Sequence, residues 1–313
     1  MKASLLLLAL AGLMFRGGPA WADLGFATCL LQGQFAGDRI PAYQDEPRTG
    51  EAAFAVPRRY ADATTNETVV RLCKTSPGGK AYFAVSFNAT RRIPDWVAYR
   101  LDPRMGQSYS EDGIDYGRDK ADFSLDPELR LAHVPQAIPF TYARDAEVPG
   151  TADGQGREKA YHRGHLVPSQ DMAFDVDASL TTFHYSNCAP QTPALNSGLW
   201  RTLEGQVRDW AAGKRPLDGE ARERPLWIVT GVYGRAERGE RGPAIGPFPQ
   251  WRAAVPSHFF KVVLFETEAG PTARAWRFPN FAERPANARL EDFEVPLRTL
   301  EAESGLRFNA DGS

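Results

Sequence analysis

The chain has 313 residues, of which 42% are hydrophobic, and its formal net charge at pH 7 is −2. This length and composition allow a substantial hydrophobic core in one large domain. The net charge excludes a generally basic protein, so a site for a polyanion would need a local positive cluster or a bound cation.

The first 22 residues predict a secretory signal peptide. Lys2 is followed by an apolar run from Leu5 to Phe15 and then by Ala20-Trp21-Ala22, a cleavage signal of the small-x-small type. The apolar run is too short to span a bilayer, and no later segment approaches about 18 uninterrupted apolar residues. We therefore expect cleavage after Ala22 and a periplasmic or secreted protein without a membrane anchor.

Residues 23–313 are expected to form a single domain, because they contain no internal repeat, low-complexity segment or linker. Cys29 and Cys73 lie in its N-terminal region, and an oxidising compartment favours a disulfide between them. Closing that loop is worth roughly 4 kcal/mol in the chain-entropy model. Cys188 is then left as a buried, unreactive thiol.

Strands are predicted where aromatic and β-branched residues gather. Four such segments should form a central sheet: Ala81 to Phe87, Asp95 to Leu101, Pro225 to Gly231 and Ser257 to Phe265.

Two helices are predicted, from Asn196 to Ala211 and from Pro296 to Gly305, where the glycine is an end signal. The first has an apolar stripe at helical spacing, formed by Leu199, Leu203, Val207 and Trp210.

A second stripe of the first helix carries polar groups, since Asn196, Trp200, Glu204 and Arg208 are each four residues apart. This stripe could carry part of a functional site, or it could be an ordinary polar edge of the helix. Asn196 is also a common helix N-cap residue, and Glu204 with Arg208 could form an ordinary surface ion pair.

The most informative segment is Tyr161-His162-Arg163-Gly164-His165, followed by Ser186-Asn187-Cys188-Ala189-Pro190-Gln191. His165 is expected on a short strand that enters a turn. A histidine that titrates near neutral pH, an amide oxygen for a hard cation, a carboxylate and a guanidinium together suit a one-metal phosphodiesterase.

A zinc site is the competing interpretation, with His162, His165, His184 and Cys188 as its ligands. If the first pair lies on a strand, residues three apart face opposite sides and cannot both reach one ion. The candidates for a local positive cluster are Arg157, Lys159, Arg163, Arg201 and Arg208.

The runs HRGHLVPSQDM and FHYSNCAPQTPALNSGLWRTLEGQVRDW resemble the signature of the DNA/RNA non-specific endonucleases, which are ββα-metal nucleases of the endonuclease G type. The resemblance extends over roughly residues 80 to 308. It implies an α+β fold with a central antiparallel sheet, flanking helices and a ββα-metal motif.

The resemblance also implies roles for single residues. His165 would be the general base that activates water, Asn196 the direct protein ligand of Mg²⁺, with Mn²⁺ as a substitute, and Glu204 would hold metal-bound water. Arg163 and Arg208 would bind substrate phosphate, and Asn187 would orient the catalytic elements.

Two features depart from the family pattern. The motif usually reads Asp-Arg-Gly-His, whereas this chain has His162 in the first position. The family also places an arginine upstream, for which Arg118 and Lys120 are both candidates.

The sequence therefore predicts a secreted Mg²⁺-dependent endonuclease that cleaves DNA and RNA without strong sequence preference and leaves 5′-phosphates. Two alternatives are a catalytically weak nucleic-acid-binding or uptake protein on the same scaffold, and a phosphodiesterase that acts on a smaller substrate. A homodimer and a protein inhibitor are left open.

Overall fold

The computed structural model describes residues 58–59, 69–75, 81–103, 105, 122–142, 161–234, 244–246 and 252–308. The predicted signal peptide lies outside these residues, as do Cys29, Arg118, Lys120, Arg157 and Lys159. Among the described helices, none is long and apolar enough to cross a membrane.

A seven-stranded sheet organises the molecule, in the order β12-β11-β10-β7-β4-β3-β2, with every neighbouring pair antiparallel. The four predicted strands are confirmed as β3, β4, β7 and β10. The strands are β2 (Val69–Thr75), β3 (Ala81–Asn88), β4 (Ile93–Leu101), β7 (Leu226–Tyr233), β10 (His258–Thr267), β11 (Gly270–Pro279) and β12 (Glu294–Val295).

Strand β11 was missed because its sequence is interrupted by arginines. Arg274 donates two hydrogen bonds to Glu294 on β12, at 2.8 and 2.7 Å, and Arg277 pairs with Glu303. These charges have partners only in the folded chain, so the sequence by itself does not show a strand there.

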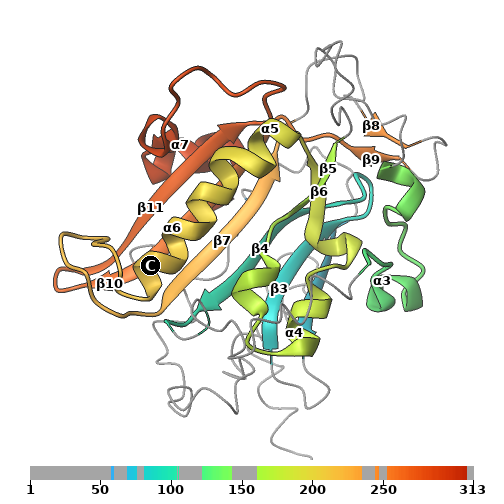
Figure 1. Cartoon of the computed structure of the whole chain (residues 1–313). Helices are drawn as coiled ribbons and strands as arrows, with labels where there is room; N and C mark the ends of the chain where they lie inside the picture. The colour runs from blue at the N-terminus through green and yellow to red at the C-terminus, as the bar shows by residue number, and fades with distance from the viewer. Residues whose placement is uncertain are drawn as a thin grey trace, which may run out of the picture.

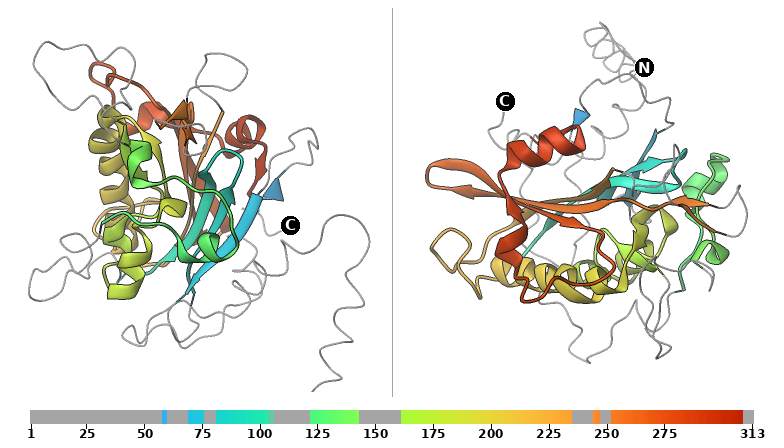
Figure 2. Two further views of the ribbon diagram at one scale, coloured as in Figure 1. Left: turned by 90° about the vertical axis from the view of Figure 1, so that its right-hand side faces the viewer. Right: turned by 90° about the horizontal axis from the view of Figure 1, so that it is seen from above.

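Helices cover both faces of the sheet, which forms the middle of three layers (Figures 1 and 2). One face carries α4 (Val176–Thr181) and α6 (Arg201–Ala211), and the other carries α7 (Leu297–Ser304). The two buried clusters follow this division: one contains Trp210 and Phe259, and the other contains Trp96 and Leu300. This is why β10 is buried along most of its length and shows no polar alternation.

Shorter elements complete the described chain. They are β1 (Arg58–Arg59), α3 (Pro127–Leu131), η4 (Pro139–Tyr142), η5 (Ser169–Met172), η6 (Tyr185–Asn187), β8 (Ala244–Ile245), β9 (Ala253–Ala254), η9 (Leu290–Phe293) and β13 (Leu306–Arg307). Strands β1 and β13 pair with each other, as do β8 and β9.

A ββα unit lies on the α6 face of the sheet (Figure 1). Strands β5 (His162–His165) and β6 (Cys188–Gln191) form an antiparallel pair. The chain then enters α5 (Pro193–Leu195), the π-type turn η7 (Asn196–Trp200) and α6. The fold class that the sequence predicts is thereby confirmed: a central antiparallel sheet, flanking helices and a ββα motif.

The helix after β6 begins earlier than predicted. Thr192 is the N-cap, since its hydroxyl accepts from the Leu195 N–H at 3.4 Å, and Pro193 occupies the first turn. The N-cap reading of Asn196 is therefore wrong, because Asn196 lies inside the helical segment. Gly198, at φ −102° and ψ −116°, interrupts the helix just before α6.

The second predicted helix is confirmed as α7. It ends at Gly305, whose φ of 69° is the left-handed conformation that favours glycine.

Candidate active site

The β5–β6 pair is tied to the rest of this layer by Asn187, which is fully buried. Its side-chain oxygen accepts from the Val167 N–H at 3.0 Å, and its amide nitrogen donates to the carbonyls of Val167 and Thr182 at 3.0 and 2.9 Å. Asn187 thus fixes the chain immediately after His165, which agrees with the orienting role that the resemblance implies.

His165 is the last residue of the short strand β5, as the sequence predicts, and it lies opposite Cys188 on β6. Its half-buried ring lies between two aromatic rings, with centroids 4.9 Å from Phe123 and 5.0 Å from Phe183. The Phe183 contact is edge-on, at 87°. This packing restricts the imidazole to a defined direction, which a proton acceptor needs.

Arg163 lies on the same strand and stacks on aromatic rings as well. Its guanidinium carbon is 5.2 Å from the centroid of Phe123 and 5.6 Å from that of Tyr142. A guanidinium held against apolar faces loses little further freedom when it binds an anion. Phe123 therefore contacts both Arg163 and His165, and connects the candidate phosphate ligand to the candidate base.

Asn196 meets β5 at its first residue, because the Asn196 side-chain nitrogen lies 3.0 Å from Nδ1 of His162. This contact brings the start of the helical segment against the strand that carries His165. The Asn196 oxygen has no hydrogen bond to any of the residues that the structure describes.

Glu204 lies two turns beyond Asn196, on α6, and faces the sheet near Lys261 of β10. Burial raises the pKa of Glu204 to about 7, while the Lys261 cation acts to lower it. Lys261 is itself buried, donates to the Thr230 hydroxyl at 2.7 Å and lies 4.9 Å from the Trp200 ring centroid. The protonation of Glu204 therefore depends on a buried lysine that belongs to the sheet.

Arg208 has a partner that the sequence did not indicate. It donates to Asp171 of η5 at 2.8 Å, and Asp171 also accepts from the Tyr99 hydroxyl at 2.7 Å. The expected surface ion pair between Glu204 and Arg208 is replaced by this buried one. The Asp171 carboxylate is therefore the partner of Arg208 in this structure. Phosphate binding by Arg208 stays a prediction.

The residues fit a magnesium ion better than a zinc ion. The Asn196 oxygen is a hard, neutral donor of the kind that Mg²⁺ prefers. No group of three or more His, Cys, Asp and Glu side chains within the described ranges could hold a metal. Cys188 is buried, its sulfur lies 3.9 Å from the Tyr142 hydroxyl, and burial raises the pKa of its thiol to about 12.

Three members of the predicted positive cluster lie in the described residues. Arg163 stacks on aromatic rings, Arg208 pairs with Asp171, and Arg201 is exposed on α6.

Sequence reasoning missed Asn280, which follows β11. Its side chain donates to the carbonyls of Pro190 and Pro256, at 3.0 and 3.1 Å, and accepts from the Thr192 N–H at 2.9 Å. It thereby fixes the connection between β6 and the helix. Nothing local marks an asparagine 88 residues from Thr192 as its partner.

Asp171 and Lys261 were also missed, although Asp171 falls inside the run HRGHLVPSQDM and Lys261 within the range of the family resemblance. Phe123 and Phe183, which pack on His165, could not be recognised from local sequence because they reach the site through the tertiary fold.

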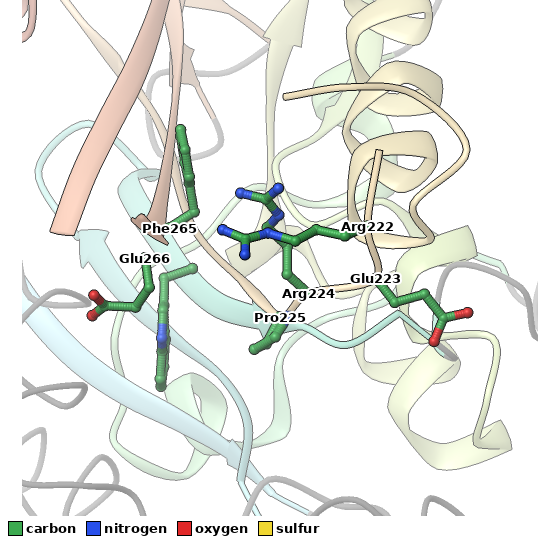
Figure 3. Close-up of a pocket in the computed structure, with 7 residues that line it drawn as sticks. Arg222, Glu223, Arg224, Pro225, Phe265 and Glu266 are labelled. Atoms are coloured by element: carbon green, nitrogen blue, oxygen red, sulfur yellow. The ribbon is translucent and has the colours of Figure 1, made fainter. Parts of the chain in front are cut away.

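A cavity of about 250 Å³ lies elsewhere, beside residues 222–225, the segment that precedes β7 (Figure 3). Trp227 and Phe265 line it, together with Arg224, which donates to both Asp218 oxygens, at 2.6 and 2.7 Å. None of the predicted site residues lines this cavity, so it is not where the chemistry is expected.

The chain is similar to several known nucleases. It is 30% identical over 230 residues to endonuclease G, mitochondrial, of Homo sapiens, covering 72% of this chain and 67% of that protein. It is 27% identical over 266 residues to a nuclease of Syncephalastrum racemosum, covering 80% and 74%. It is 34% identical over 166 residues to nuclease 1, mitochondrial, of Schizosaccharomyces pombe, of which it spans just under half, 47%.

The fold is similar to that of a chain in the crystal structure of an EndoG/EndoGI complex. The TM-score is 0.50 at 23% identity, with 72% of this chain and 82% of that chain covered. The sequence model of the DNA/RNA non-specific endonucleases matches residues 66–313. With most of its length matched in this way, the chain belongs to the DNA/RNA non-specific endonuclease family and is a hydrolase.

Proposed function

We propose that this chain is an exported, Mg²⁺-dependent endonuclease that hydrolyses DNA and RNA without strong sequence preference. The observation that carries the proposal is the 3.0 Å contact of Asn196 with His162, which joins the candidate metal ligand to the strand that ends in His165. Family membership supports the reaction class, and the donor set supports a divalent cation bound by oxygen.

His165 is the general base in this proposal. Its imidazole takes a proton from the water that attacks phosphorus, and the bond from phosphorus to the 3′ oxygen breaks. The departing 3′ oxygen takes a proton from solvent water, and the phosphate remains on the 5′ end of the other fragment. Asn196 would hold a magnesium ion, or manganese in its place, whose charge stabilises the phosphate oxygens. Glu204 would accept hydrogen bonds from water at this site, and Arg163 would position the phosphate.

The absence of sequence preference follows from what these groups can contact. A guanidinium and a cation bind the phosphodiester backbone, which positions a nucleic acid but carries no base information directly. The negative charge of the whole chain makes the bound cation important for a polyanionic substrate.

Digestion of plasmid DNA and of RNA, with and without EDTA, tests the proposal. Wild-type protein should cleave both substrates, and EDTA should stop cleavage until Mg²⁺ is restored. Asn196→Ala should lower the rate about 10²-fold or more, as loss of an electrostatic stabiliser does. His184→Ala and Cys188→Ala should leave the metal requirement unchanged. Binding without cleavage, or cleavage of small phosphodiesters alone, would instead support one of the two alternatives.

Metal analysis of the purified protein separates magnesium from zinc. Stoichiometric, tightly held zinc that is lost in Cys188→Ala and retained in Asn196→Ala would overturn the ligand assignment.

Export is proposed from the predicted signal peptide. Protein recovered from the periplasm or the medium should begin at Asp23, which N-terminal sequencing measures. Recovery of full-length chain in the cytoplasm alone would contradict export.

A further inference from the structure

His162 occupies the first position of the motif, where the family pattern has aspartate. Its Nδ1 lies 3.0 Å from the side-chain nitrogen of Asn196, and both side chains are half-buried. An amide nitrogen only donates hydrogen bonds. Nδ1 of His162 must therefore accept, with the ring proton on Nε2.

This contact decides which end of the Asn196 amide faces the site. The two ends of an amide are nearly equal in size, so packing alone hardly distinguishes them. Only the oxygen end can bind a cation, since the nitrogen end presents hydrogens. A hydrogen bond that engages the nitrogen leaves the oxygen pointing away from His162, where it has no hydrogen bond to a described residue.

We propose that His162 is a positioning residue that holds the Asn196 amide with its oxygen directed at the divalent cation. The inference rests on the proposed function, because it requires Asn196 to be the ligand. An outer partner of this kind orients a metal ligand without touching the metal. His162 does so through a ring nitrogen, whereas an aspartate would place an additional negative charge beside the cation.

Variants at position 162 test whether a hydrogen-bond acceptor for the Asn196 amide is required there. His162→Ala removes the acceptor, while His162→Asp and His162→Gln each supply an oxygen that accepts from the Asn196 amide. His133→Asn is the matched control, because His133 is exposed and has a φ of 54°, a conformation that asparagine tolerates.

The first measurement is Mn²⁺ binding to the purified protein without substrate. Electron paramagnetic resonance detects the free Mn²⁺ ion and so gives the bound fraction. Loss of an outer partner typically weakens metal affinity 10- to 100-fold, so we expect at least about a 10-fold loss in His162→Ala. His162→Gln should bind nearly as wild type, His162→Asp at least as tightly, and His133→Asn unchanged.

The second measurement is cleavage as a function of Mg²⁺ concentration. His162→Ala should need more Mg²⁺ for half-maximal rate and recover most of its kcat at saturation. A purely structural role would lower kcat at every Mg²⁺ concentration in Ala, Gln and Asp variants alike. If His162→Ala does not fold, as judged by thermal melting, the Gln and Asp variants still test the inference, since weak Mn²⁺ binding by both would overturn it.

Asn196→Ala distinguishes this inference from the proposed function. If His162→Ala binds Mn²⁺ with wild-type affinity and Asn196→Ala loses Mn²⁺ affinity, the inference is overturned and the proposed function stands. Undiminished binding in Asn196→Ala overturns the ligand assignment, and the inference with it.

Discussion

At the scale of single residues, the candidate site consists of side chains whose orientation is set by their neighbours. His165 is packed between Phe123 and Phe183, and Asn187 fixes the backbone that follows it. These contacts prepare the imidazole before a substrate arrives, and orientation of a catalytic group lowers the barrier of the step that it assists.

His165→Ala should lower the cleavage rate by about 10²- to 10⁴-fold, because general-base catalysis is lost. The variant also loses its contacts with two phenylalanine rings, so some loss of stability should accompany it. Phe183→Leu is the control, since it disturbs the same packing and keeps the imidazole, and it should retain most of the activity. Wild-type turnover in a folded, metal-replete His165→Ala sample would refute the assignment.

At the scale of elements, α6 is joined to the sheet by buried charges. Arg208 and Asp171 connect it to η5 and, through Tyr99, to β4. Lys261 of β10 lowers the pKa of Glu204 on α6 through its charge and lies 4.9 Å from the Trp200 ring centroid, just before α6. A helix held in this way keeps its position relative to β5, and with it the position of Asn196.

Asp171→Ala should destabilise the protein by about 3–5 kcal/mol, because it leaves the Arg208 cation, 12% exposed, without its partner. Urea denaturation measures this. Asp209→Ala, on the same helix, is the control. Its pair with Arg215 is solvent-exposed on the arginine side, at 62%, and should contribute less than about 1 kcal/mol. Equal losses in the two variants would argue against a structural role for the buried pair.

Lys261→Met should move the acidic limb of the pH–rate profile to higher pH. Burial raises the pKa of Glu204 to about 7, Lys261 and Arg208 act to lower it, and Asp171 acts to raise it. Removal of the Lys261 cation therefore raises this pKa further, and Glu204 ionises only at higher pH. The profile of kcat/KM against pH at saturating Mg²⁺ measures the shift.

Lys261→Arg keeps the positive charge and should leave that limb near its wild-type position. An unshifted limb in Lys261→Met would mean that ionised Glu204 is not required.

At the scale of the whole molecule, the sheet is covered on both faces, and the ββα unit occupies the α6 face (Figure 2). Asn280 connects the chain after β11 to the junction of β6 and α5. The site is therefore supported by elements from distant parts of the sequence.

The predicted bond between Cys29 and Cys73 should stabilise the mature protein by roughly 4 kcal/mol. Cys73 lies on β2, and Cys188 is free and buried. Mass spectrometry of a non-reduced digest should find a peptide linking Cys29 to Cys73, and Cys29→Ser should lower the melting temperature. A peptide linking Cys188 to either of the others would contradict this.

The sequence by itself determined the four strands, the two longer helices and the family. It could do so because hydrophobic periodicity, β-branched composition and the motif around His165 are local signals. The partners of the site residues were decided only by the tertiary structure. Arg208, for example, donates to Asp171 at 2.8 Å.

The contact of His162 with Asn196 is of the same kind. It joins residues 34 positions apart, through a strand pair and a helix start that no single segment specifies. Hydrogen bonds between distant side chains depend on distances of about 3 Å, and only the packed fold sets such distances. The sequence therefore supplied the chemical groups of the site, and the fold decided which of them meet.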